Sequence, residues 1–377
     1  QGPDAPSQPG VSEVWVRQGD LLGRVLLRDD IRPQSAPVLD ELRRAGIRSK
    51  IHVLAPLPPG QSAEAARLGV SLAVDDAGQA RALEAVDRVP SAPRPSPRPP
   101  LAARPRSLSV TEIKTLIRDP YAIYARHSLR LRALYPLVQS PDAPLRGIVV
   151  HAVLEDFVKS VVVDPANLTR AHLLEIANGT LADLVPWPAA RTIWLARLAR
   201  IADWFIEAER ARLATASPIA FEDDARGLLE LPDLAFTIRG VADRIDRNAA
   251  GEIQIYDYKT GNPPTDKQQK HFDKQLLIEA AMVEEGAFRK IGAAPVSRAT
   301  FIGLGNPPVE QHAPLEEEPP AVVLENLRKL IAAYLDPEQG FTARRMMEKV
   351  VFAGEFDHLA RFGEWDGSDP AQPEDLT

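Results

Sequence analysis

Residues 253–261 read IQIYDYKTG, and their alternation predicts a half-buried β-strand. Side chains of a strand point alternately to its two faces, so one face carries Ile253, Ile255, Asp257 and Lys259. The other face carries Gln254, Tyr256 and Tyr258. An acid and a base at the end of an apolar face are costly to bury unless they find charge partners. A metal ion and a phosphate would supply those partners.

The segment before this strand completes a candidate site. Residues 234–247 (LAFTIRGVADRIDR) predict a second strand, and residues 248–251 (NAAG) predict the turn between the two. A hairpin of this kind would set Asp243 near Asp257. Two neighbouring carboxylates repel each other unless one is protonated or a cation lies between them. Hard oxygen ligands suit Mg²⁺ or Mn²⁺, so the pattern predicts a divalent metal site.

The two strands resemble a known active site. The segments GVADRID (240–246) and YDYKTG (256–261) are similar to the RecB-type branch of the PD-(D/E)xK nuclease superfamily. Upstream, GIVVHAVLE (147–155) resembles the helix that carries a metal-binding histidine in that branch. Over residues 108–366 the chain is similar to the nuclease domains of AddB-type subunits of helicase–nucleases. The resemblance implies an α/β, restriction-endonuclease-like fold, with a mixed sheet core flanked by helices.

The resemblance also implies roles for individual residues. The implied catalytic residues are Asp243, Asp257 and Lys259. The implied metal ligands are His151, Asp243, Asp257 and the main-chain carbonyl of Tyr258. Glu155 and Gln275 are implied as supporting residues. Whether the site holds one ion or two stays open.

Two simpler interpretations stay open beside these roles. Asp257 and Lys259 can form an ordinary surface ion pair, which contributes less than about 1 kcal/mol. A lone histidine such as His151, at the margin of the apolar face of a predicted helix at 146–162, is more often a structural residue than a ligand.

Further residues downstream are candidates for binding DNA. Residues 265–285 predict one helix, on which Lys267, Lys270 and Lys274 recur at helical spacing and would line a DNA path. The resembled family places a tyrosine four residues after the glutamine at position 275, where this chain has Glu279. We therefore expect the contact made by that tyrosine to differ here.

The resemblance implies a function in DNA repair. It implies a Mg²⁺- or Mn²⁺-dependent deoxyribonuclease, an exonuclease acting on 5′-ended single strands at double-strand breaks during recombination. The resemblance implies an AddA-type helicase–nuclease as the partner. This sequence has no Walker A loop, so we expect that it does not drive unwinding itself. The alternatives are a non-catalytic DNA-binding or scaffold subunit, and an inactive chimeric or truncated product.

Composition narrows the choice of cofactor, partner and compartment. The sequence has no cysteine, which excludes disulfides, thiolate zinc sites and iron–sulfur clusters and fits a cytoplasmic protein. Members of the resembled family with a cluster place a cysteine where this chain has Asp119. No apolar run has the length of a membrane span. The net charge of −7 means that DNA must be bound through a local basic surface, a metal or a partner.

The chain divides by composition into five parts. We expect a disordered start (1–10), a small α/β unit (11–89), a linker rich in Pro and Arg (90–107), the nuclease domain (108–366) and an acidic, frayed tail (367–377).

The small α/β unit at 11–89 has a resemblance of its own. Its segments GRVLLRDDIRP (23–33) and AEAARLGV (63–70) are similar to part of the haloacid-dehalogenase-like phosphorylation domain of P-type ATPases, although the phosphorylated Asp motif is absent. Its predicted strands alternate with predicted helices at 34–45 and 61–68, which implies parallel pairing.

Overall fold

The computed structural model describes residues 11–18, 21–28, 51–53, 72–74 and 90–376, apart from 135–136, 223 and 348–352, together with positions 37, 41 and 44. The chain divides into two compact units, residues 1–90 and residues 91–377. No helix among the described residues has both the length and the apolar character that crossing a membrane requires.

The first unit contains two small strand pairs. Strands β1 (Val11–Gln18) and β2 (Leu21–Arg28) pair antiparallel, whereas β3 (Ile51–Val53) and β4 (Leu72–Val74) pair parallel. The parallel pairing predicted for this unit is therefore wrong for β1 and β2. Two residues separate these strands, and a parallel connection needs a dozen or more. The expected disordered start (1–10) and helix 61–68 lie outside the described residues, as does most of helix 34–45.

A mixed five-stranded sheet forms the centre of the second unit. Its order is β13-β12-β11-β10-β7, with β11 antiparallel to β10 and parallel to β12. The bounds of its strands are β7 (Ala216–Phe221), β10 (Arg244–Asn248), β11 (Ile253–Lys259), β12 (Val296–Gly303) and β13 (Val309–His312). This mixed sheet between helices confirms the fold class predicted from the sequence.

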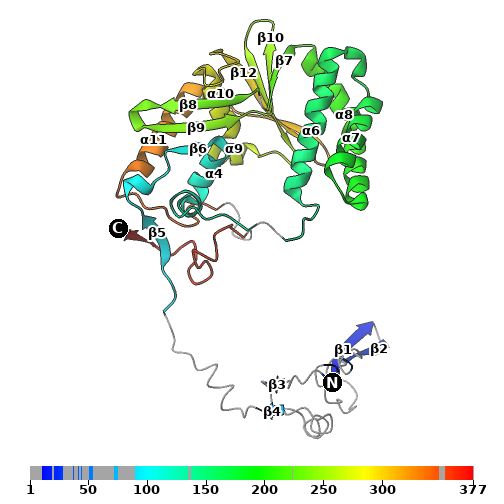
Figure 1. Ribbon diagram of the computed structural model, residues 1–377, viewed down its shortest axis with the longest axis vertical. Helices are drawn as coiled ribbons and strands as arrows, with labels where there is room; N and C mark the ends of the chain where they lie inside the picture. The colour runs from blue at the N-terminus through cyan, green and yellow to red at the C-terminus, as the bar shows by residue number, and fades with distance from the viewer. Residues whose placement is uncertain are drawn as a thin grey trace. The chain divides into compact units, whose positions relative to one another are not determined.

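Helices cover both faces of this sheet. They are α4 (Val110–Arg118), α6 (Ala143–Val163), α7 (Arg170–Leu184), α8 (Pro188–Leu213), α10 (Gln275–Glu284) and α11 (Pro320–Leu335). Ile253 and Ile255 of β11 join a hydrophobic cluster with α4, α10 and α11. Tyr256 and Tyr258 join a second cluster with α6, α7 and α8, which stand together beside the sheet in Figure 1. Strand β11 is thus buried on both faces, and its prediction as half-buried is wrong.

The strand predicted at 234–247 is in fact two strands in different sheets. Strand β9 (Phe236–Val241) lies between β6 (Ser107–Ser109) and β8 (Arg226–Leu231) in a three-stranded sheet, whereas β10 belongs to the central sheet. The backbone at Gly240 passes so close to α10 that an added Cβ would lie 3.0 Å from Met282 Cε. The chain leaves this contact at residues 242–243, and so Asp243 lies in a bend between the sheets.

The helix predicted at 265–285 is also interrupted. Helix α9 (Asp266–His271) ends before residues 272–274, and α10 begins at Gln275. In the interruption, the buried Asp273 carboxylate lies 2.6 Å from Lys114 Nζ and accepts a hydrogen bond from the Gln275 backbone N–H. Helix α10 then begins at Gln275, after Lys274.

The expected linker and tail pair with each other. Strand β5 (Arg94–Arg98), inside the predicted tether, runs parallel to β14 (Ala371–Asp375) in the predicted frayed tail. Figure 1 shows the C-terminus beside β5. The Arg94 side chain donates hydrogen bonds to four backbone carbonyls, those of Ala343, Arg344, Gly367 and Asp369. Both sequence-based expectations are wrong here, because strand pairing and the Arg94 guanidinium tie these two segments to folded parts of the chain.

The end of the chain is also tied to the start of the second unit. Asp119, at the position of the cluster cysteine in the resembled family, accepts a hydrogen bond from the Arg344 backbone N–H at 2.9 Å. The Arg344 side chain pairs with Asp357 at 2.6 Å and lies 3.8 Å from the Phe362 ring centroid. Trp365 is buried in the core. Polar and aromatic contacts therefore hold this segment.

A capping box starts α4, in which the Ser109 side chain accepts from the Glu112 backbone N–H and the Glu112 carboxylate accepts from the Ser109 backbone N–H. Burial raises the pKa of Glu112, but hydrogen bonds from His127 and Ser109 outweigh it and lower this pKa to about 2. The folded pKa lies below the usual value of 4.5. The stabilisation is therefore present above pH 4.5 and lost as the pH falls through about 2.

Replacing Glu112 with Gln should remove this pH dependence. Gln keeps the capping geometry but has no charge. Allowing for partial exposure, wild type should lose ~1–2 kcal/mol more than Glu112→Gln between about pH 6 and about pH 2.5. Urea unfolding of both proteins at each pH measures the difference. Parallel pH profiles would contradict the assignment.

Candidate active site

Four elements bring polar side chains to one edge of the central sheet. They are the end of β11, the bend before β10, the end of β7 and helix α6. Asp243 Oδ2 accepts a hydrogen bond of 2.7 Å from the Tyr258 backbone N–H. The bend therefore holds Asp243 beside the Asp257–Tyr258 backbone, close to where a hairpin was expected to set it.

His151 reaches the same edge from α6. The Asp142 side chain caps this helix by accepting from Leu145 N–H, and its buried valines face the sheet. His151 Nε2 lies 2.8 Å from the Tyr258 carbonyl oxygen. Its Nδ1 lies 3.5 Å from Asp243 Oδ1 and 3.7 Å from Glu222 Oε1.

Asp257, Lys259 and Gln275 form a second group. Lys259 Nζ lies 2.7 Å from Asp257 Oδ2 and donates to Gln275 Oε1 at 3.1 Å. Gln275 Nε2 donates to Asp257 Oδ1 at 2.6 Å. Gln275 holds both charged groups because the helix interruption places it at the first turn of α10. Asp257 is 3% exposed, so its pair with Lys259 is not the surface ion pair of the simpler interpretation.

The charged groups at this edge strongly shift one another's pKa values. Burial, and then the charge of Asp243, raise the pKa of Asp257 to about 6, against the opposing effect of Lys259 and His151. Burial lowers the pKa of His151, but the hydrogen bond and charge of Asp243 outweigh it and raise this pKa to about 9. Buried carboxylates therefore attract positive charge to this edge.

The donor set fits a divalent cation. One ligand atom each from His151, Glu222 and Asp243 lie within 4.8 Å of one another. The Tyr258 carbonyl oxygen adds a hard oxygen donor beside His151. Imidazole and carboxylate oxygens are ligands that Mg²⁺ and Mn²⁺ accept. Because a metal ligand must be a neutral imidazole, binding would release the proton of His151.

Glu222 was missed by the sequence analysis, whereas Asp257 was predicted and lies beside Lys259. Glu222 directly follows β7, the neighbour of β10, and its backbone N–H donates to the Asp243 carbonyl. A carboxylate at the end of a strand was the available signal, but only the strand order brings it to the site. Asp257 contacts Lys259 and Gln275, and it is not one of the three clustered ligands.

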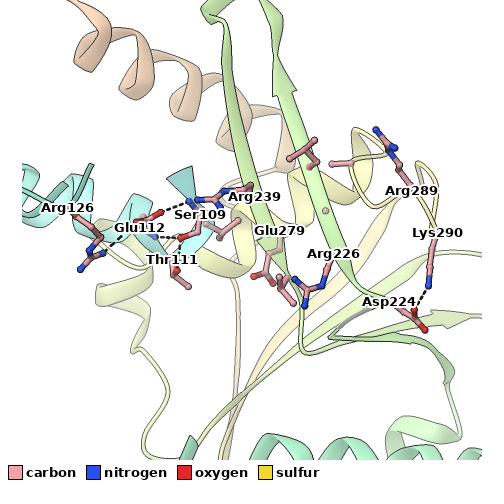
Figure 2. Close-up of a pocket in the computed structure, with 16 residues that line it drawn as sticks. Ser109, Thr111, Glu112, Arg126, Asp224, Arg226, Arg239, Glu279, Arg289 and Lys290 are labelled. Atoms are coloured by element: carbon pink, nitrogen blue, oxygen red, sulfur yellow. Dashed lines mark hydrogen bonds and ion pairs between the residues drawn. The ribbon is translucent and has the colours of Figure 1, made fainter. Parts of the chain in front are cut away.

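Glu279 lies next to the second group. It is 1% exposed, and its Oε1 accepts from Gln275 Nε2 at 3.3 Å. Burial, and then the charges of Asp257 and Asp243, raise the pKa of Glu279 well above its usual value. Glu279 also lines a cavity whose walls carry several arginines (Figure 2). A buried carboxyl group with a raised pKa therefore stands where the resembled family has a tyrosine.

Other predicted residues lie apart from this site. The Glu155 carboxylate pairs with Lys159, one turn along α6. Lys274 Nζ lies 2.7 Å from Glu318, so its charge is already paired. Lys267 and Lys270 are exposed on the short α9 and no longer share one continuous helix with Lys274.

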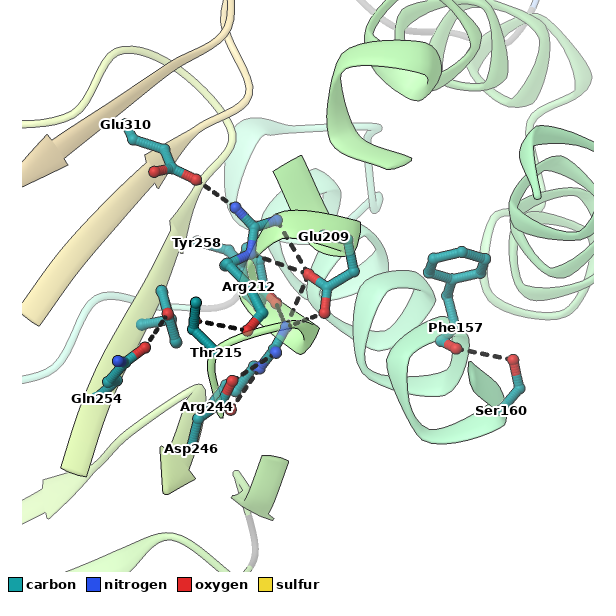
Figure 3. A network of polar contacts seen from close by, with 11 residues as sticks. Phe157, Ser160, Glu209, Arg212, Thr215, Arg244, Asp246, Gln254, Tyr258 and Glu310 are labelled. Atoms are coloured by element: carbon teal, nitrogen blue, oxygen red, sulfur yellow. Dashed lines mark hydrogen bonds and ion pairs between the residues drawn. The ribbon is translucent and has the colours of Figure 1, made fainter. Parts of the chain in front are cut away.

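A buried ionic network supports the site from the other face of the sheet (Figure 3). Arg244 is fully buried and donates to Glu209 at 2.7 Å and to Asp246 at 2.6 Å. Its Nη1 also donates to the Tyr258 hydroxyl at 3.4 Å. Arg212 extends the network from Glu209. Tyr258 is thus held at its hydroxyl by this network and at its backbone by Asp243 and His151.

Comparison with known proteins agrees with this geometry. The family model of the PD-(D/E)XK nuclease superfamily matches residues 107–349. An uncharacterized protein of Rickettsia bellii (strain RML369-C) is 34% identical over 187 residues, which are 49% of this chain and 22% of that protein. An uncharacterized protein of Rickettsia conorii (strain ATCC VR-613 / Malish 7) is 33% identical over 191 residues, 49% of this chain and 23% of that protein. The matched stretch thus spans less than a quarter of these relatives.

Proposed function

Because this chain belongs to the PD-(D/E)XK nuclease superfamily, we propose that it hydrolyses phosphodiester bonds of single-stranded DNA with Mg²⁺ or Mn²⁺. The observation that supports the proposal most strongly is that the Asp257–Lys259 pair and the cluster of candidate metal ligands lie at the same edge of the central sheet. Lys259 Nζ lies 2.7 Å from the buried Asp257 carboxylate. His151, Asp243 and Glu222 converge beside them.

The residues divide the chemistry between them. His151, Asp243, Glu222 and the Tyr258 carbonyl would hold the ion, with Asp257 nearby as the further ligand implied by the family resemblance. A bound divalent ion lowers the pKa of a water molecule and screens the charge of the phosphate. Lys259 donates hydrogen bonds to the attacking water or to a phosphate oxygen and stabilises its negative charge.

Asp257 and Gln275 keep Lys259 in position. The Lys259 ammonium forms an ion pair with Asp257 and donates a hydrogen bond to the amide oxygen of Gln275. Lys259 therefore needs little reorganisation when negative charge develops on the phosphate. Burial lowers the pKa of Lys259, but the charge of Asp257 outweighs it and raises this pKa above its usual value. The Asp257 charge therefore favours the protonated, positively charged form of Lys259.

The wider role that we propose follows the resemblance to AddB-type nuclease domains. In that role the chain is an exonuclease that shortens 5′-ended single strands at double-strand breaks. A helicase–nuclease of the AddA type in the cytoplasm would expose those strands. The segments GVADRID and YDYKTG support this role, and all three clustered ligands and the Asp257–Lys259 pair are compatible with it.

The test is metal-dependent cleavage by the full chain. With labelled single-stranded DNA, Mg²⁺ or Mn²⁺ should give product and excess EDTA should remove it, because the site lacks charge balance without a cation. Re-addition of metal to the same sample should restore cleavage, which controls for unfolding. DNA binding without metal-stimulated cleavage would contradict the proposal and support the non-catalytic scaffold hypothesis.

A further inference from the structure

A cavity of about 850 Å³ opens beside the proposed catalytic groups. Its walls come from the start of α4, from the paired strands β8 and β9, and from the segment after α10 (Figure 2). Gly240 and Val241, which form part of the wall, directly precede the bend that holds Asp243. The chain itself therefore links the cavity wall to the bend that holds Asp243.

The cavity is locally basic although the chain as a whole is acidic. Its positively charged wall residues are Arg126, Arg226, Arg239, Arg289 and Lys290. Several of the wall charges are already paired: Glu112 with His127 and Arg126, and Asp224 with Lys290. Among the described residues no ion pair involves Arg239 or Arg289, and both side chains are exposed. Their positive charge is therefore available to an anion.

Glu279 connects this wall to the catalytic groups. Its carboxyl lies between Arg239 and Arg226 in Figure 2. Its Oε2 is buried and has no hydrogen-bond partner among the described residues, which leaves a polar atom in the wall that a ligand can satisfy. Through Gln275, Glu279 is two hydrogen bonds from Asp257.

The lining defines the chemistry of the ligand. Arginines without an ion-pair partner favour a polyanion, and the cavity volume lies in the ~300–1,000 Å³ range of sites for small ligands. A single strand threads such a space, whereas a duplex stays outside it. None of the lining residues is aromatic. Because base stacking is then absent, contacts fall on the sugar–phosphate backbone, and the site should tolerate any sequence.

We propose that this cavity binds the backbone of a single-stranded nucleic acid, with Arg239 and Arg289 on its phosphates and Glu279 hydrogen-bonded to the strand. The cavity thereby guides the next phosphodiester bond to Asp257 and Lys259. This inference deepens the proposed function and rests on it. The strand path replaces Lys267, Lys270 and Lys274, which the sequence pattern suggested, by arginines from β9 and from the segment after α10.

The test is binding of a fluorescent 12-nucleotide oligothymidylate to the full chain in EDTA, so that no cleavage interferes. Arg239→Glu and Arg289→Glu should each weaken binding ~10-fold, as loss of a charged hydrogen bond does. Each should also make the dependence of log K on log salt shallower by about 0.7, the value for one single-strand phosphate contact. Fluorescence anisotropy at several salt concentrations measures both effects.

Arg200→Glu is the matched control. Arg200 is exposed on α8 and does not line the cavity, so the same charge reversal there should leave binding and the salt slope near wild type. Circular dichroism checks that each variant is folded. Wild-type binding by both cavity variants, or equal weakening by Arg200→Glu, would overturn the inference.

A second readout separates this inference from the proposed function. With Mn²⁺, the cavity variants should raise KM for the oligonucleotide but leave hydrolysis of bis(p-nitrophenyl) phosphate unchanged, because that small diester needs no strand path. Normal KM values in the variants of an active enzyme would reject the cavity alone. Arginine-dependent binding by a chain that never cleaves would reject the proposed function and keep the cavity as a binding site.

Discussion

Replacing Lys259 with Met is expected to lower kcat for single-stranded DNA by ~10²–10³-fold or more, the usual effect of removing one group that stabilises transition-state charge. Lys259 is the ammonium held beside the buried Asp257 carboxylate at 2.7 Å. Met keeps the length of the side chain without its charge. Single-turnover cleavage at saturating metal measures the loss in the chemical step.

The variant needs a control for the charge that it leaves behind. Without Lys259, Asp257 loses its nearest cation while remaining buried, which costs stability. Lys259→Met combined with Asp257→Asn removes both charges, should fold better than the single variant and should be equally inactive. Lys329→Met, which breaks an exposed ion pair with Glu325 on α11, should cleave like wild type. Cleavage within a few-fold of wild type by folded Lys259→Met would reject the catalytic role.

Replacing Arg244 with Met should destabilise the protein by ~3–5 kcal/mol, the cost of removing one partner from a buried ionic group. Arg244, Glu209 and Asp246 each have fully buried side chains. The variant would leave the Glu209 and Asp246 carboxylates without their central cation. Urea unfolding at neutral pH measures the free energy of unfolding of the variant against wild type.

An exposed arginine provides the comparison. Arg328→Met breaks a surface ion pair with Asp233 and should cost no more than ~1 kcal/mol. Arg244→Lys should also be destabilising, because Lys cannot donate in the planar fork that reaches Glu209 and Asp246 together. A loss below ~1 kcal/mol for Arg244→Met would show that the network contributes little to stability.

The network also bears on the active site. Arg244 donates to the Tyr258 hydroxyl, and the Tyr258 backbone contacts both Asp243 and His151. Loss of Arg244 should therefore loosen the backbone that aligns the metal donors. Any folded fraction of the variant is expected to need more metal for half-maximal cleavage than wild type.

Alternation along residues 253–259 was enough to place Asp257 and Lys259 on one face, because side-chain direction in a strand is a local property. Helical periodicity likewise predicted the helix that carries His151. These local patterns, with the family resemblance that they carry, identified the fold class and most of the candidate site. Such patterns can be read from the sequence because they are independent of the order of the strands in the sheet.

Tertiary structure alone decided the rest. Glu222 joins His151 and Asp243 because β7 is the neighbour of β10, and Glu209 meets Arg244 across 35 residues. The break at residues 272–274 divided the predicted lysine-bearing helix into α9 and α10, and Arg94 fixed a segment whose prolines suggested a tether. The physical reason is the same in each case. A buried charge or an unpaired strand edge forms its contact with a group that tertiary packing places nearby, and that group can lie far away in the sequence. Composition and periodicity describe only local sequence, so they do not identify it.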